Sequence, residues 1–133
     1  MFIDTSGLLC YLSKDEAEHP TAQRLFKGER RHLIHGYVLA EFVALARVRK
    51  IPRKATLSFS SRLLAHPRLE IIWVERALHQ EALELLSLRL DKAYSLCDAV
   101  SFVLMKRHGI QEALTTDHHF EQEGFTRRLG KAI

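Results

Sequence analysis

The chain has 133 residues, a length typical of one domain, so we expect a single domain over residues 1–133. Hydrophobic residues make up 47% of the chain and charged residues 27%, proportions that exclude intrinsic disorder and fibrous repeats. Lys and Arg number 20 against 16 Asp and Glu, a formal net charge of +4. This mild excess permits a polyanionic partner such as nucleic acid without requiring one.

The cysteines and the first residues indicate the environment of the protein. Cys10 and Cys97 form no Cys-x-x-Cys pair, so we expect neither a zinc ribbon nor a disulfide framework, and free thiols fit a reducing compartment. Asp4 interrupts the apolar start, which excludes a signal peptide there. No stretch approaches the ~18 apolar residues of a membrane span. We therefore expect a soluble, cytoplasmic protein.

Short β-like runs alternate with helical patterns along the chain. The expected strands are residues 1–3, 31–35, 69–74, 113–115 and 125–129. One expected helix begins after residue 7, and the others cover residues 21–27, 37–50, 53–65, 78–86 and 95–108. Pro52 and Gly109 mark two of the helix ends. Strands separated by helices imply parallel crossovers, which predicts a three-layer α/β/α sandwich with a parallel sheet of about five strands.

The acidic residues stand at informative places in this pattern. Asp4 follows the first expected strand and Asp117 the fourth, whereas Asp98 and Glu41 lie in the first turns of two expected helices. In an open α/β sheet, the carboxyl ends of strands and the amino ends of following helices share one edge, where ligands bind. We therefore expect these four carboxylates to meet at that edge.

Each acid also has an explanation that involves no ligand. Asp4 could cap the following helix, Ser95 and Asp98 fit a capping box, and Asp117 could be a turn residue. Glu41 is harder to explain in this way, because the residues three before and four and seven after it are apolar. A carboxylate buried in such a stripe needs a partner, or its pKa rises and it protonates.

Electrostatic repulsion indicates what must accompany four carboxylates. At about 5 Å and an effective dielectric constant of about 20, each pair repels by roughly 3 kcal/mol, which over all pairs is on the order of 15–20 kcal/mol. This exceeds the ~5–15 kcal/mol stability of a domain, so some acids are protonated or a cation lies among them. An all-oxygen ligand set suits Mg²⁺ or Mn²⁺ rather than Zn²⁺.

The histidines do not predict a zinc site. His32 and His35 would point to opposite faces of a strand, and His118 and His119 are adjacent, so none has the spacing of zinc ligands. For each histidine we expect a solvated surface position.

Four segments together resemble the PIN domain, and within it most closely the VapC-type ribonuclease toxins. The segments are Phe2–Ser6, Ala40-Glu41, Ser95–Phe102 and Leu114–Phe120. The resemblance covers nearly the whole chain, with the four acids in the order and spacing of the family. It implies a parallel sheet of about five strands and a divalent-metal-dependent endoribonuclease that leaves a 5′-phosphate and a 3′-hydroxyl. It also implies a cognate antitoxin and a homodimer.

The resemblance further implies a catalytic acidic site for Mg²⁺ or Mn²⁺, made of Asp4, Glu41, Asp98 and Asp117. Three hydroxyl groups would support it: those of Thr5 and Ser6 at Asp4 and a metal-bound water, and that of Ser95 at the Asp98 turn. Asp91 matches an acid sometimes found before that turn, and a solvated surface acid explains it equally well.

RNA would need cations near so acidic a site. Five of the residues 47–54 are basic and are candidates for phosphate binding, the alternative being a solvated face: Arg47, Arg49, Lys50, Arg53 and Lys54. Two other functions stay open, a non-catalytic PIN-like module that binds RNA or protein and an RNA-processing nuclease that is not a toxin. A phospho-receiver domain and an Asp-x-Asp phosphatase do not fit, because Thr5 and Ser6 follow Asp4 where a second acid is needed.

Overall fold

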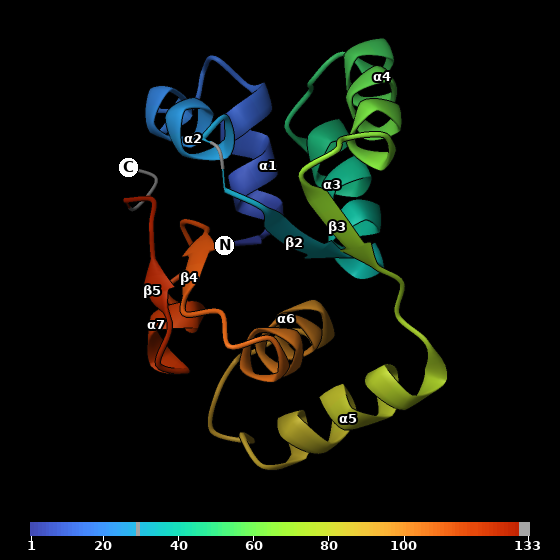
Figure 1. Cartoon of the computed structure of the whole chain (residues 1–133), viewed down its shortest axis with the longest axis vertical. Helices are drawn as coiled ribbons and strands as arrows, with labels where there is room; N and C mark the ends of the chain where they lie inside the picture. The colour runs from blue at the N-terminus through green and yellow to red at the C-terminus, as the bar shows by residue number, and fades with distance from the viewer. Residues whose placement is uncertain (29, 131–133) are drawn as a thin grey trace.

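The structure is a computed structural model that describes residues 1–28 and 30–130. Its sheet has five strands, all paired in parallel, in the order β3-β2-β1-β4-β5 (Figure 1). The strands are β1 (Phe2–Ile3), β2 (His32–His35), β3 (Leu69–Ile72), β4 (Glu112–Leu114) and β5 (Thr126–Arg127).

Within the described residues, seven helices connect these strands, namely α1 (Thr5–Leu12), α2 (His19–Phe26), α3 (Gly36–Val48), α4 (Arg53–Leu64), α5 (Arg76–Ser87), α6 (Leu96–Arg107) and α7 (His119–Gln122). Helices α1 to α4 lie on one side of the sheet, and α5, α6 and α7 lie on the other (Figure 1). The predicted α/β/α sandwich with a parallel five-stranded sheet is therefore confirmed.

The order of the strands makes β1 the point at which the chain changes direction across the sheet. From β1 the chain builds β2 and β3 on one side, then returns to place β4 and β5 on the other. In such sheets the crevice between the two diverging directions is the usual ligand site. Here it lies where β1 and β4 end.

Gly7 allows α1 to approach β4 at this point. A Cβ atom on Gly7 would lie 2.2 Å from the carbonyl oxygen of Leu114, so no larger residue fits. The backbone amide of Asp4 donates to the same carbonyl at 3.2 Å. The segment that begins at Asp4 is thus held directly against the end of β4.

Both histidines of β2 are buried, so their expected solvated positions are wrong. His32 Nε2 lies 2.9 Å from the carbonyl oxygen of Phe26 in α2, and His35 Nε2 lies 2.9 Å from Ser101 Oγ in α6. Because α2 and α6 cover different sides of the sheet (Figure 1), the two side chains do point to opposite faces, as predicted.

His35 joins the beginnings of two helices. Its Nδ1 accepts hydrogen bonds from the backbone amides of Tyr37 and Val38 at the start of α3. The Nε2 proton therefore donates to Ser101 Oγ, which in turn donates to the carbonyl oxygen of Cys97 in the first turn of α6. Burial lowers the pKa of His35 to about 4, so the imidazole is neutral at physiological pH.

Helices α3 and α6 end in the same way but with different residues. The second residue after the helix has a positive φ in both cases, 60° at Lys50 and 64° at Gly109. The next amide then bonds to a carbonyl five residues back, from Ile51 to Ala46 and from Ile110 to Met105. Glycine takes this conformation freely, whereas lysine takes it at a cost.

Several boundaries differ from those predicted. Helix α1 begins directly at Thr5 and α2 at His19, both earlier than expected. Strand β3 ends at Ile72, two residues earlier than expected, and Trp73 beyond it is 60% exposed. Strand β5 is shorter than the expected residues 125–129. Both cysteines are free, as predicted, and both are buried. Within residues 1–28 and 30–130, no helix is both long and apolar enough to cross a membrane.

Candidate functional site

A cleft of about 500 Å³ opens where β1 and β4 end, and all four of the singled-out carboxylates line it. Asp4 follows β1, Asp117 follows β4, Glu41 comes from α3 and Asp98 from α6. The three supporting hydroxyl residues also line it: Thr5, Ser6 and Ser95. Asp91 does not, since its side chain is 73% exposed and pairs with Lys92 Nζ at 3.1 Å.

Asp4 is the most buried of the four acids. Its Oδ2 accepts hydrogen bonds from Thr115 Oγ1 at 2.8 Å and from Ser6 Oγ at 3.3 Å. Burial raises the pKa of Asp4 to about 7; the Thr115 hydrogen bond opposes this, and the charge of Asp98 adds to it. The side chain makes no hydrogen bond that caps α1, so the capping explanation for Asp4 is wrong.

Asp98 does form the capping box that its spacing with Ser95 suggests. Ser95 Oγ accepts from the Asp98 amide at 3.0 Å, and Asp98 Oδ2 accepts from the Ser95 amide at 3.1 Å. His119 Nδ1 lies 3.0 Å from the same Oδ2. Burial raises the pKa of Asp98, and the nearby charge of Asp117 adds to this rise. The cap therefore orients a carboxyl group that also faces the cleft.

The loop that carries Asp117 is fastened on both sides. Asp117 Oδ1 accepts from the His119 amide at 2.9 Å, so the residue also acts in a turn. On one side, the Asp117 amide donates to Thr115 Oγ1 at 3.0 Å. On the other, β5 and the segment after it bond to the loop backbone: Arg127 Nη1 donates to the Thr116 carbonyl, and the Leu129 amide donates to that of Thr115.

Glu41 is half-buried, so the expectation that it lies within a buried apolar stripe is wrong. The buried residues of α3 are Val38, Phe42 and Ala46, and Glu41 stands beside this stripe, on the cleft. It accepts no hydrogen bond from any residue that the structure describes. Burial, followed by the charges of Glu41, Asp4 and Asp98, raises the pKa of the Cys97 thiol.

The donor atoms fit a hard divalent cation. In each aspartate the side-chain hydrogen bonds converge on one carboxylate oxygen, Oδ2 in Asp4 and Asp98 and Oδ1 in Asp117, which leaves the other oxygen for a further ligand. Thr5 Oγ1 is buried and has no hydrogen-bond partner among the described residues. Free carboxylate oxygens and an unpaired hydroxyl are ligands that suit Mg²⁺ or Mn²⁺.

Two residues of the site were not singled out in the sequence. The hydroxyl that binds Asp4 most closely is that of Thr115, whereas Thr5 Oγ1 makes no such bond. His119 is only 18% exposed and lies between Asp98 and Asp117, so its expected solvated position is wrong. With its neighbour His118 and with Asp117 it forms a group whose ligand atoms lie within 4.8 Å of one another, although no metal-ligand spacing was expected here.

The five candidate RNA-binding residues do not all line one pocket. Arg49 lines the cleft and forms an ion pair with Glu16. Arg47 and Arg53 line a separate small pocket, Lys50 lines another together with Arg49, and Lys54 is exposed on α4. Only Arg49 of the five therefore lies beside the carboxylates.

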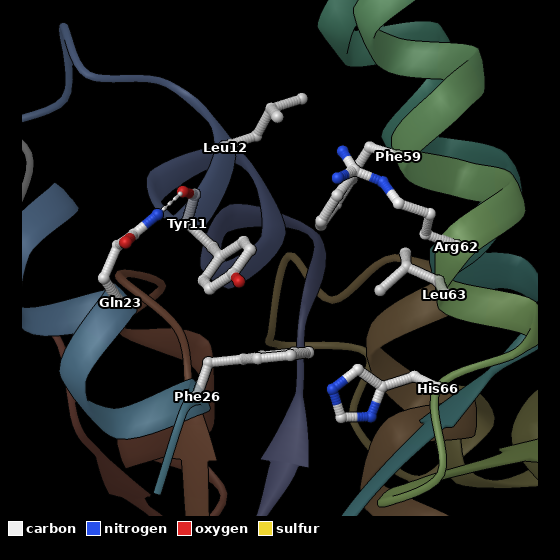
Figure 2. A pocket seen from close by; sticks show the side chains of 8 residues that line it. All are labelled: Tyr11, Leu12, Gln23, Phe26, Phe59, Arg62, Leu63 and His66. Carbon is white, nitrogen blue, oxygen red and sulfur yellow. Dashed lines mark hydrogen bonds between the residues drawn. The ribbon is translucent and has the colours of Figure 1, made fainter.

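A second cavity, of about 320 Å³, lies between α1, α2 and α4 and contains no carboxylate (Figure 2). Aromatic rings and aliphatic side chains dominate its lining, with Arg62 and His66 as its basic groups. The lining residues are Tyr11, Leu12, Gln23, Phe26, Phe59, Arg62, Leu63 and His66. This lining offers no site for a hard cation.

The fold and the acidic cleft at its switch point define a PIN-type domain, and the chain belongs to the PIN domain family, which it matches over residues 1–125. It is 32% identical, over 126 residues, to the 23S rRNA-specific endonuclease VapC20 of Mycobacterium tuberculosis, covering 94% of this chain and 95% of the relative. The same relative occurs in a second strain of that organism.

The solved structures give the same result. The crystal structure of Mycobacterium tuberculosis VapC20, described as a toxin that cleaves the sarcin–ricin loop, matches with a TM-score of 0.85 and 28% sequence identity. The match covers 94% of this chain and 95% of that chain. The likeness therefore extends over almost the whole of both proteins.

Proposed function

We propose that this protein is a divalent-metal-dependent endoribonuclease and the toxin of a VapBC-type toxin–antitoxin pair. The observation that carries the proposal is the meeting of Asp4, Glu41, Asp98 and Asp117 at one cleft. A relative that aligns with 94% of the chain is a 23S rRNA-specific endonuclease, which supports RNA as the substrate.

The residues of the cleft can be given roles on this basis. A bound Mg²⁺ or Mn²⁺ supplies an acidified water as the nucleophile and offsets charge on the phosphodiester. Asp4 and Asp98 are pre-oriented ligands, because Thr115 holds one and Ser95 and His119 hold the other. Glu41 and the free oxygen of Asp117 complete the acidic set and are placed to accept a proton.

The raised pKa values speak against a non-catalytic module. Burial raises the pKa of both Asp4 and Asp98, which means that ionising them costs free energy in the folded protein. Among the described residues, no Lys or Arg offsets this cost through a hydrogen bond or an ion pair with either acid. A module that bound RNA without cutting it would gain nothing from this arrangement. The toxin and the processing nuclease differ in their biology rather than in their chemistry.

The proposal includes partners and organisation. A VapC-type toxin pairs with an antitoxin, so we infer a cognate antitoxin for this chain, together with a homodimer and a single domain over residues 1–133. Among the basic candidates, Arg49 is the best placed to bind RNA, because it lies on the cleft. If it contacts a phosphate, Arg49→Gln should reduce the slope of log affinity against log salt concentration by about 0.7 for single-stranded RNA.

A cleavage assay tests the proposed function. Purified protein is incubated with ribosomal RNA that contains the sarcin–ricin loop, in Mg²⁺, Mn²⁺ or EDTA, and the ends of the products are mapped. We expect metal-dependent cuts that leave a 5′-phosphate and a 3′-hydroxyl. Asp98→Asn should abolish cleavage, whereas the matched control Asp91→Asn, on the exposed side chain, should cut like the wild type.

Two results would contradict the proposal: equal cleavage by wild type and Asp98→Asn, or cleavage that persists in EDTA. Expression in a bacterial host then separates the two biological roles. Growth arrest that a co-expressed antitoxin relieves indicates the toxin, and normal growth with altered RNA processing indicates the other nuclease.

A further inference from the structure

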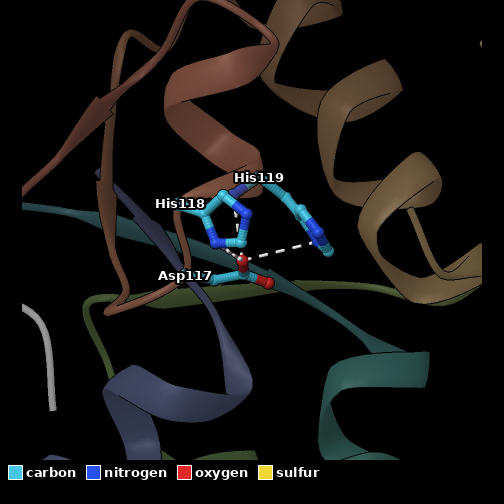
Figure 3. Close-up of side chains that lie close together, drawn as sticks. All are labelled: Asp117, His118 and His119. Carbon is cyan, nitrogen blue, oxygen red and sulfur yellow. Dashed lines mark hydrogen bonds and ion pairs between the residues drawn. The ribbon is translucent and has the colours of Figure 1, made fainter. Parts of the chain in front are cut away.

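A group of side chains with imidazole ligands lies at the exposed side of the cleft, on the loop after β4 (Figure 3). His118 Nδ1 lies 3.7 Å and His119 Nδ1 3.4 Å from the same oxygen, Asp117 Oδ1. Asp98 Oδ2, which lies on α6 and outside this group of three, is 3.0 Å from His119 Nδ1. Two nitrogens and one oxygen of the loop thus lie within 4.8 Å of one another, with an oxygen of Asp98 beside one of the nitrogens.

The spacing of these atoms is close to that of a four-coordinate ion. Metal–ligand bonds of about 2.0–2.1 Å place the corners of a tetrahedron about 3.4 Å apart. For three of the ligand pairs the observed separations of 3.0, 3.4 and 3.7 Å bracket this value. His118, whose side chain is 62% exposed, is free to move toward the other ligands.

We propose that Asp98, Asp117, His118 and His119 bind a transition-metal ion that prefers imidazole, Zn²⁺ above all, at a position beside the all-oxygen site of the hard catalytic cation, with which it shares Asp98 and Asp117. Imidazole nitrogen is a ligand for Zn²⁺, whereas Mg²⁺ favours oxygen ligands in octahedral geometry. His119 coordinates through Nδ1 as the tautomer protonated at Nε2.

The nearby thiol does not belong to this site. Cys97 is buried, and burial together with the charges of Glu41, Asp4 and Asp98 raises the pKa of its thiol. A thiol must lose its proton to bind a metal, so these surroundings disfavour it as a ligand. The ligand set is therefore two imidazoles and two carboxylates.

Occupancy by Zn²⁺ would inhibit RNA cleavage, a consequence that rests on the proposed function, although Zn²⁺ binding itself does not. Asp117 belongs both to the histidine group and to the acidic site, and Asp98, the fourth ligand that we propose, lines the same cleft. A tetrahedral ion with four protein ligands has no open position for water or substrate. Zn²⁺ would thus withdraw two carboxylates from the catalytic set without providing catalysis of its own.

Metal titrations without RNA test the site. Metal-free protein is titrated with Zn²⁺ in a calorimeter and, separately, with Co²⁺ while visible absorption is recorded. We expect one ion per chain, strong visible bands of four-coordinate Co²⁺ and no near-ultraviolet charge-transfer band from a thiolate. His118→Gln should weaken Zn²⁺ binding at least tenfold, and His118→Ala should do the same.

The matched control is His108→Gln, which changes another exposed histidine at the opposite end of α6 from Asp98. It should bind Zn²⁺ like the wild type. Equal Zn²⁺ affinity in wild type and His118→Gln, the weak spectrum of six-coordinate Co²⁺, or a thiolate band would each overturn the assignment.

The inhibition is measured on Mg²⁺-dependent cleavage. Zn²⁺ should inhibit the wild type, and the concentration for half-inhibition should rise at least tenfold in His118→Gln. Equal sensitivity of the two proteins would overturn the inhibition. A wild type that binds Zn²⁺ as described yet cleaves no RNA in Mg²⁺ would overturn the proposed nuclease function and leave the Zn²⁺ site in place.

Discussion

Replacing Asp4 by Asn should stabilise the metal-free protein above neutral pH. Burial raises the pKa of Asp4 from 3.8 to about 7, so between these pH values the folded protein holds a proton that the unfolded chain releases. The contribution of Asp4 to the free energy of unfolding is therefore greatest below pH 4, and it is lost as the pH rises through the folded pKa of about 7. Asn keeps the shape of the side chain and still accepts from Thr115 and Ser6, without the charge.

The pKa difference sets the size of the effect. A shift of roughly three units corresponds to at most about 4 kcal/mol at pH 8. In a chain of this length, 1 kcal/mol moves the Tm by roughly 3–5 °C, so we expect Asp4→Asn to raise the Tm at pH 8 by about 5–15 °C. At pH 5 the folded protein keeps the proton but the unfolded chain already releases it, so roughly 1.6 kcal/mol of the effect is present, and the Tm difference should be less than half of that at pH 8.

Differential scanning calorimetry in EDTA at pH 5 and pH 8 measures this difference. The matched control is Asp91→Asn, whose carboxylate is exposed and should leave the Tm unchanged at both pH values. Adding Mg²⁺ at pH 8 should raise the Tm of the wild type, because a ligand that binds only the folded state stabilises it by mass action. The rise should be smaller in Asp4→Asn, which has lost a ligand.

Two results would refute this reasoning. Asp4→Asn could melt below the wild type at pH 8 in EDTA, or the Tm difference between the two proteins could be the same at pH 5 and pH 8. Either result would mean that the Asp4 carboxylate carries no electrostatic cost in the folded protein, and the argument for a cation at the cleft would lose its basis.

Three further predictions concern the backbone that holds the cleft, and urea unfolding measures each. Gly7→Ala should cost more than about 2 kcal/mol, because its Cβ would lie 2.2 Å from the Leu114 carbonyl oxygen. Lys50→Gly should gain about 1 kcal/mol, because φ is 60° there. His35→Ala should cost about 1–2 kcal/mol through loss of the cap on α3, and it should lower the cleavage rate because α3 and α6 lose their link.

Each of these has a matched control. Gly28→Ala should be nearly neutral, since its nearest contact is an ordinary 3.5 Å. Lys54→Gly, inside α4, should cost about 1 kcal/mol, the opposite sign to Lys50→Gly. His35→Asn, which restores a cap acceptor, should recover part of the loss. Each argument has one result that would contradict it. These results are a Gly7→Ala variant as stable as the wild type, a Lys50→Gly variant less stable than the wild type, and a His35→Asn variant no more stable than His35→Ala.

The elements of the fold were predictable because they depend on local patterns. The apolar spacing of α3 and α6 and the glycine after α6 are visible in the sequence, and both helices are present. The order of the strands depends instead on which strand pairs with β1, and the two residues of β1 carry no signal for this choice. The left-handed residue after α3 was missed because lysine is uncommon there.

The site was predictable in part for the same reason. The four acids could be placed on one edge because each follows a strand or begins a helix, which needs no knowledge of strand order. Thr115 lies 111 residues after Asp4 in the sequence, and only the pairing of β1 with β4 reveals that the two side chains are in contact. His119 was missed because the spacing rule for zinc ligands assumes a regular helix or strand, whereas in a turn adjacent side chains can converge.

The fastening of the Asp117 loop has a consequence for the synthesis of the protein. The bonds from Arg127 and Leu129 come from residues that leave the ribosome long after Asp4, Glu41 and Asp98 have been made. A nascent chain would therefore carry three of the acids while the loop of the fourth was still unsupported. The acidic cleft would therefore be complete only once residues 127–129 had been made and had joined the fold.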